Sequence, residues 1–209
     1  VAIMITHHHW DHTGGIDDLL TAFPDIPVFG PNNLKIKQIT HRLSEDDEFD
    51  LPHLDCHFSV IEVPGHTLDH IAFYSELGLF CGDTLFSAGC GRLFEGTAQQ
   101  MYQSLAKLTA LPEDTLVYCT HEYTLANIAF AQAVEPNNQQ LLDYKEWAMQ
   151  QRNKDLPTLP SSIKKELSMN PFLRCHSNEL IAHVSQHNVA PLNTQPEVFA
   201  ALRSWKDNF

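Results

Sequence analysis

The sequence has few basic residues, few cysteines and no long apolar run, and each shortage excludes a class of protein. Its 209 residues hold 13 Lys and Arg against 26 Asp and Glu, a net charge of −13 with histidine neutral. A protein that follows nucleic-acid phosphates normally presents a basic face, so this balance argues against a nucleic-acid partner. No stretch approaches the roughly 18–20 consecutive apolar residues that cross a bilayer, so we expect no membrane partner.

The five cysteines are scattered along the chain, and none forms a C-x-x-C pair. Their odd number and spacing argue against a disulfide framework and favour a reducing compartment, for which we expect the cytoplasm. A content of 43% hydrophobic and 19% charged residues is typical of a folded globular chain. At about 150 residues per domain, the length predicts one large domain with an appendage.

Short apolar runs bounded by Gly, Pro or Asp dominate the first part of the chain and predict β-strands. The expected strands span 1–6, 27–30, 57–63, 70–75, 78–82 and 115–119. Helices are expected at 16–23 and 98–111, each followed by a proline that ends it. The chain starts without Met inside an apolar run that needs sheet partners, so we expect a fragment without its opening strands.

From Glu122 onward, apolar residues recur at helical spacing. Helices are expected from 125 to before Pro136, around 141–147 and over 197–205, with a Pro/Ser-rich linker at 156–162. This order predicts an α+β fold with a strand-rich domain at 1–122 and a helical domain at 123–209.

Histidine is unusually frequent, with 13 residues, and four of them lie in Thr-His-His-His-Trp-Asp-His-Thr-Gly-Gly at 6–15. In an extended segment, alternate side chains share one side, so His7, His9 and Asp11 should converge, while His12 should turn away as the chain enters a helix. Imidazole and carboxylate groups suit zinc, manganese or iron. A histidine-tag remnant is the plain alternative, but a tag would not interleave Asp and Trp between a strand and a Gly-Gly turn.

Three further ligand candidates each follow a predicted strand: His66 after 57–63, Asp83 after 78–82 and His121 after 115–119. Taken singly, none of the three indicates a metal site. An Asp after Gly, for example, is usually only a turn residue. Strand ends are where sites on a sheet scaffold are commonly built, so their shared position favours a common site with the first cluster.

This ligand order resembles the metallo-β-lactamase superfamily, and more closely its hydroxyacylglutathione hydrolase (glyoxalase II) family. The stretches that carry the resemblance are 6–15, 64–70, 82–91, 121–124 and 202–207. It implies an αββα sandwich, here without its N-terminal strands, followed by a helical C-terminal substrate-binding domain. It also implies a monomer with a small-molecule substrate.

Carried over residue by residue, the resemblance implies two divalent metal ions, for which we expect zinc, with iron or manganese served by the same ligands. One ion would be held by His7, His9 and His66, the other by Asp11, His12 and His121, with Asp83 bridging both. The implied glutathione contacts are Arg92, Phe94, Tyr123, Arg203 and Lys206.

The implied reaction is hydrolysis of S-D-lactoylglutathione to glutathione and D-lactate, the second step of methylglyoxal detoxification. Two close divalent ions lower the pKa of a shared water towards about 7, which supplies a bridging hydroxide for attack on the thioester. The catalytic carboxylates are then Asp83, which bridges the ions, and Asp11, which orients the hydroxide.

Three positions depart from the family pattern. Phe94 stands where many relatives have Tyr, and Asp69 and Thr120 each replace a common Gly, where we expect Asp69 to act only as a turn residue. The alternatives are another enzyme of this fold, such as a persulfide dioxygenase or a lactamase-like hydrolase, or an inactive metal-binding fragment. The complete second ligand set disfavours a dioxygenase, because dioxygenases of this fold keep only one iron.

Overall fold

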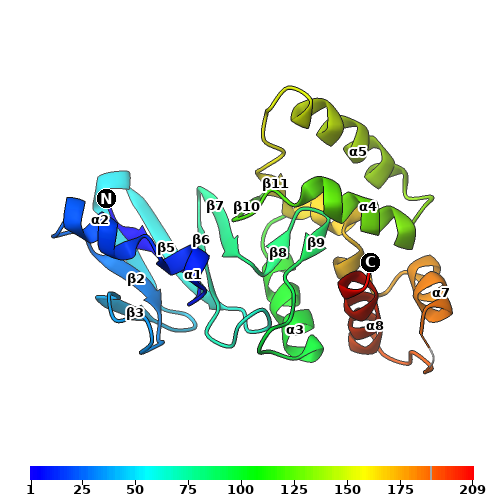
Figure 1. Ribbon diagram of the computed structural model, residues 1–209, viewed down its shortest axis with the longest axis horizontal. Helices are drawn as coiled ribbons and strands as arrows, with labels where there is room; N and C mark the ends of the chain where they lie inside the picture. Colours follow the sequence, from blue (N-terminus) through cyan, green and yellow to red (C-terminus); the bar gives the residue numbers. More distant parts are fainter. Residues whose placement is uncertain (189) are drawn as a thin grey trace.

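The computed structural model describes residues 1–188 and 190–209. One mixed sheet forms its centre, in the order β11-β10-β7-β6-β5-β4, and a smaller parallel sheet, β1-β2-β3, lies beside it (Figure 1). The strands of the central sheet are β4 (Glu48–Leu51), β5 (Cys56–Glu62), β6 (Ile71–Ser75), β7 (Gly78–Gly82), β10 (Leu116–Cys119) and β11 (Ser161–Ser162). The smaller sheet contains β1 (Ile3–Met4), β2 (Val28–Pro31) and β3 (His41–Leu43).

Alternating side chains bind these sheets into layers. Val28 on β2 packs against Ile16 of α2 (Ile16–Ala22), while the next residue, Phe29, packs against Phe58 and Phe73 of the central sheet. The opposite face of the central sheet, with Leu79 as an example, packs against α3 (Ala98–Thr109). Since successive strand residues point to opposite faces, the result is a helix–sheet–sheet–helix sandwich.

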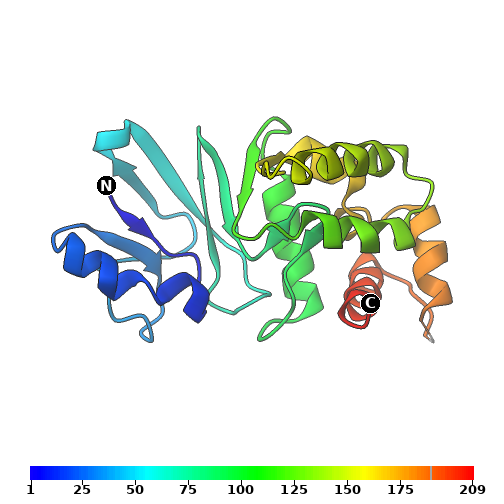
Figure 2. The same ribbon diagram turned by 45° about the horizontal axis from the view of Figure 1, so that its top comes forward.

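The helical second part gathers at one end of this sandwich (Figure 2). Its helices are α4 (Thr124–Val134), α5 (Gln139–Arg152), α6 (Ile163–Met169), α7 (Asn178–Gln186) and α8 (Gln195–Asp207). Helix α8 lies along α3, and Phe199 and Leu202 share one buried cluster with Leu105 of α3. The helical part therefore extends the core of the sheet. Among the described residues, no helix is both long and apolar enough to span a bilayer.

The elements that sequence periodicity missed are short or locally determined. They are α1 (Trp10–Thr13), β3, β4, the hairpin β8 (Leu85–Phe86) and β9 (Gly89–Cys90), the 3₁₀ turns at Pro52–Leu54 and Pro171–Leu173, α6 and α7. The predicted linker at 156–162 is wrong at its end, because Ser161 and Ser162 form β11 and pair with β10. Thr158 in the same stretch is buried, and its backbone N–H donates to Glu122.

A buried carboxylate joins the helical part to the β8–β9 hairpin. Glu166 on α6 is fully buried and accepts hydrogen bonds from the Ala88 backbone N–H at 2.9 Å, from Asn170 Nδ2 at 2.9 Å and from Ser161 Oγ at 2.5 Å. Burial raises the pKa of this carboxyl, although the hydrogen bonds oppose the shift. Ala88 adopts a left-handed conformation with φ of 55°, so this contact holds the hairpin turn in an uncommon shape.

We predict that Glu166→Gln is tolerated and that Glu166→Ala lowers the free energy of unfolding by about 1–3 kcal/mol, because Ala leaves a buried N–H unpaired. The pKa of Glu166 is higher in the folded chain than in the unfolded chain, so the protonated carboxyl stabilises the fold fully at pH values below its unfolded pKa. This stabilisation is lost as pH rises through the folded-state pKa. The stability of Glu166→Gln relative to wild type should therefore grow as pH rises above about 4.5. Urea unfolding across this range measures it, and a pH-independent difference would contradict the assignment.

Candidate metal and substrate site

Two histidines after β1 and one after β5 form the first cluster of potential ligands. His7 Nε2 lies 3.1 Å from His9 Nδ1, and His66 Nε2 lies 3.0 Å from the same nitrogen. His7 and His66 are almost fully buried. Burial lowers the pKa of both imidazoles, with neighbouring histidines adding to the effect, so both stay neutral. Neutral imidazole is the form that ligates a metal ion.

A second cluster lies beside the first and combines residues of α1 with the end of β10. Asp11 Oδ2 is 3.6 Å from His12 Nε2 and 3.5 Å from His121 Nε2. The prediction that His12 turns away is wrong, because the chain becomes helical at Trp10. In a helix, consecutive side chains are about 100° apart rather than 180°, so Asp11 and His12 can reach the same point.

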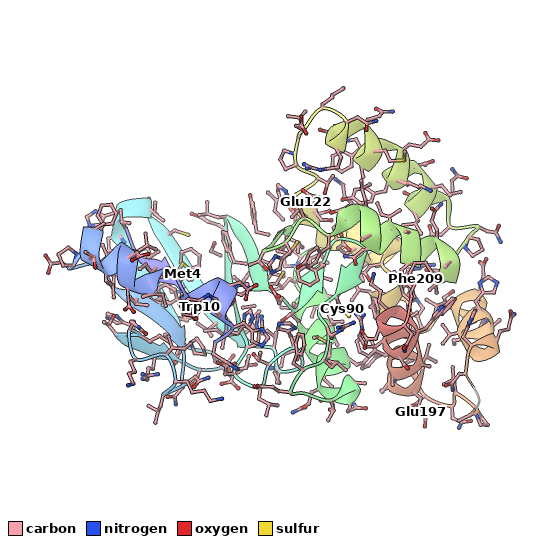
Figure 3. All side chains as sticks on the ribbon, viewed as in Figure 1. Met4, Trp10, Cys90, Glu122, Glu197 and Phe209 are labelled. Carbon is pink, nitrogen blue, oxygen red and sulfur yellow. The ribbon has the colours of Figure 1, made fainter. Side chains whose placement is uncertain are left out.

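Asp83 lies between the two clusters. Its Oδ1 is 3.3 Å from His12 Nε2, and its Oδ2 is 3.5 Å from both His66 Nε2 and His121 Nε2. The site therefore brings together all seven of the ligands inferred from the sequence. Nitrogen-bearing side chains gather in this region, between the labelled Trp10 and Cys90 (Figure 3).

The donor set fits divalent metal ions. Among the described residues, the one buried side-chain N or O atom without a hydrogen-bond partner is His12 Nε2, which faces the Asp11 and Asp83 carboxylates. Burial disfavours the charged form of His12, but the Asp83 carboxylate outweighs it and raises the pKa of the ring. The pKa of Asp83 is lowered despite burial, chiefly by its contacts with His12 and Thr120. Nitrogen and oxygen donors of these types, packed this closely, match a metal centre.

Residues beyond the ligands support Asp83. His70 is buried, and its Nε2 accepts the Asp83 backbone N–H at 3.0 Å, while burial lowers the pKa of its ring to about 3. Thr120 Oγ1 donates to Asp83 Oδ1 at 2.5 Å. In the sequence, Thr120 stands out only as a departure from a family glycine, and neither the role of Thr120 nor that of His70 has a local pattern.

Three of the predicted substrate contacts lie beside the potential metal ligands. Phe94 is 62% exposed and meets His9 edge-on at 5.4 Å between ring centroids. Tyr123 is half exposed and stacks on His121 at 4.8 Å. Arg92 is exposed, and its Nε donates to Asp207 Oδ1 at 3.3 Å.

The other two predicted contacts lie on α8. Arg203 is buried; its Nη1 donates to the Cys90 carbonyl at 3.0 Å and its Nη2 to Asp207 Oδ1 at 2.8 Å. Lys206 is partly buried, with Nζ 5.1 Å from the Phe130 ring centroid. Burial, helped by Arg203, lowers the pKa of Lys206 to about 8. Asp207, which holds both arginines, was missed, although its i,i+4 spacing from Arg203 was a usable signal.

The two halves of the chain match two family models. Residues 1–121 match the metallo-beta-lactamase superfamily, and residues 122–209 match the hydroxyacylglutathione hydrolase C-terminus. A hydroxyacylglutathione hydrolase of Nitrosomonas eutropha is 52% identical over 209 residues, which is 100% of this chain and 82% of that protein. One of Shewanella pealeana is 51% identical over 210 residues, covering 100% of this chain and 80% of that protein.

The chain belongs to the hydroxyacylglutathione hydrolase family. The resemblance inferred from the motifs is thereby confirmed, as is the α+β fold. Solved structures with the same fold include ETHE1 from Myxococcus xanthus, with a TM-score of 0.63 and 25% identity, covering 99% of this chain and 76% of that one. The BLEG-1 B3 metallo-beta-lactamase has a TM-score of 0.58 and 25% identity, and the match covers 83% of this chain and 77% of that one. As a member of this family, the chain is a thioester hydrolase with a divalent metal site.

Proposed function

We propose that the protein hydrolyses S-(2-hydroxyacyl)glutathione, with S-D-lactoylglutathione as the preferred thioester, to glutathione and a 2-hydroxy acid. The observation that carries this proposal is Asp83, whose carboxylate lies 3.3–3.5 Å from histidines of both clusters of potential metal ligands. A one-ion enzyme of this fold would not need the second cluster. The names of the relatives supply the substrate class.

We assign His7, His9 and His66 to one ion, Asp11, His12 and His121 to the other, and Asp83 to both. Zinc is our first choice of metal, and iron or manganese would fit the same nitrogen and oxygen donors. When bound, such ions lower the pKa of a water molecule and stabilise negative charge on a carbonyl oxygen.

The chain's own residues then orient the reaction. The Asp11 side chain is 60% exposed, so its carboxylate can accept a hydrogen bond from the attacking oxygen nucleophile and orient it. Phe94 and Tyr123 stand at the mouth, each packed against a proposed ligand, and can hold the thioester between them. The leaving thiolate is a stable anion with a pKa near 8.5, so it needs little help from a general acid.

The second part of the chain supplies contacts for glutathione, which is why we propose a division into a catalytic domain at 1–122 and a substrate-binding domain at 123–209. Glutathione carries two carboxylates, and the protein has a net charge of −13, so binding requires a local basic patch. Arg92, Arg203 and Lys206 provide it beside the Cys90 loop. The five free cysteines agree with a reducing compartment, and we propose a cytoplasmic monomer.

The proposal is tested by assaying hydrolysis of S-D-lactoylglutathione and measuring metal content on the same sample. We expect close to two ions per chain, loss of hydrolysis after chelation and recovery when zinc is returned. A β-lactam offered in parallel should be left intact. A sample with two bound ions that cleaves the β-lactam and leaves the thioester unchanged would contradict the proposed function.

We predict that Asp83→Ala removes at least one ion and lowers kcat at least about 100-fold, because losing a residue shared by both ions should cost no less than losing an outer-shell partner. Asp114→Ala is the matched control, since Asp114 is an exposed carboxylate just before β10. Metal analysis and steady-state kinetics of both variants decide the matter. Equal effects would refute the bridging role.

We predict that Lys206→Ala raises KM about 10- to 100-fold with kcat nearly unchanged, because a charge-assisted hydrogen bond remote from the thioester is worth roughly 1.5–3 kcal/mol in both ground and transition states. With its pKa lowered to about 8, Lys206 loses its charge as pH rises through that value, so KM of the wild type should rise there. Lys206→Arg stays charged and should keep a flat KM. A KM that is independent of both pH and substitution would remove Lys206 from the site.

A further inference from the structure

His8 lies between two proposed ligands, and its ring is held by two carboxylates outside the metal clusters. His8 Nδ1 is 2.8 Å from Asp69 Oδ1, and His8 Nε2 is 3.4 Å from Glu95 Oε1. The side chains are 18%, 13% and 33% exposed, respectively, so water screens them only partly. We call these three residues the His8 clamp.

Asp69 is the most heavily bonded member of the clamp. Besides His8, its carboxylate accepts from Thr67 Oγ1 at 2.7 Å and from Asn33 Nδ2 at 2.7 Å. Burial raises the pKa of Asp69, but these hydrogen bonds outweigh it and lower the pKa overall. The expectation that Asp69 is only a turn residue is wrong, because its side chain joins three segments that are distant in sequence.

The segments joined by the clamp are the ones that carry the first ligand cluster. Asp69 follows His66 by three residues, and Glu95 Oε2 accepts the backbone N–H of Leu68 at 2.9 Å. The Glu95 loop is also fixed to the His66 loop through the backbone, where Phe94 N–H donates to the His66 carbonyl at 3.2 Å. The clamp therefore connects the His7–His9 segment to the His66 and Glu95 loops, which are already hydrogen-bonded to each other.

We propose that Asp69, assisted by Glu95, is a positioning residue that holds His8 and thereby sets the spacing of His7 and His9 relative to His66. This inference rests on the proposed metal ligands. A metal ion binds more tightly when its ligands are held in place beforehand, since less conformational entropy is lost on binding. The clamp raises affinity at the first cluster, whereas the cluster of Asp11, His12 and His121 has no contact with Asp69 among the bonds of the described residues.

The test is a metal titration of the complete protein, with a chromophoric chelator as competitor for zinc. Asp69→Gly should weaken the first-cluster ion about 10- to 100-fold and leave the other ion close to wild type. Asp69→Asn keeps an acceptor for His8, so its zinc affinity at the first cluster should lie between those of wild type and Asp69→Gly. His8→Gln should reproduce the loss, and combining it with Asp69→Gly should add little, because both changes break one contact.

Asp50→Asn is the matched control. Asp50 Oδ1 lies 2.8 Å from His57 Nδ1, and Glu48 lies 3.6 Å from the other ring nitrogen, so the control breaks a similar triad on strands β4 and β5, away from the ligand loops. Melting of the metal-free proteins separates positioning from general stability. Zinc affinity unchanged in Asp69→Gly, or losses that simply add in the double variant, would overturn the proposal. Because the readout is zinc affinity, a wild type that binds two ions but leaves the thioester intact would contradict only the proposed function.

Discussion

The structure depends on one carboxylate placed where two groups of imidazoles meet. Asp83 is buried just after the end of β7, and its carboxylate faces histidines from α1 and from the segments after β5 and β10. The His7 and His66 ring nitrogens lie 3.1 and 3.0 Å from His9 Nδ1, and imidazole nitrogens that converge in this way are typical of a metal site. Nearly every feature around the site supports this arrangement, from the His70 ring behind Asp83 to the clamp on His8.

The helical part of the chain stabilises the β8–β9 hairpin, which follows Asp83 along the chain. Buried Glu166 fixes the turn at Ala88, and buried Arg203 bonds to the Cys90 carbonyl, so the turn and the C-terminal end of the β8–β9 hairpin are held from the helical part. Cys90 leads along the chain to Arg92, whose carbonyl lies 2.8 Å from His66 Nδ1, and to Phe94, whose ring packs against His9 and His66. The proposed substrate contacts and the proposed metal ligands are thus joined through one hairpin, and binding energy far from the reacting group can in this way help to orient it.

The strand ends and the ligand types could be predicted from the sequence, because strand periodicity and the chemistry of His and Asp are local properties. His66, Asp83 and His121 were found in this way. The direction of His12 was not, because the prediction assumed an extended chain as far as Asp11, whereas the four-residue helix α1 begins at Trp10 and has no periodic pattern of its own. The roles of Asp69 and Glu166 were also hidden, because each depends on partners that only the tertiary fold brings within reach.

The most direct test of this account is a crystal structure of the zinc-loaded protein, with anomalous diffraction recorded at the zinc absorption edge. The account predicts two anomalous peaks on either side of Asp83. One should lie among His7, His9 and His66, and the other among Asp11, His12 and His121. A single peak, or a peak coordinated by residues outside these seven, would contradict it.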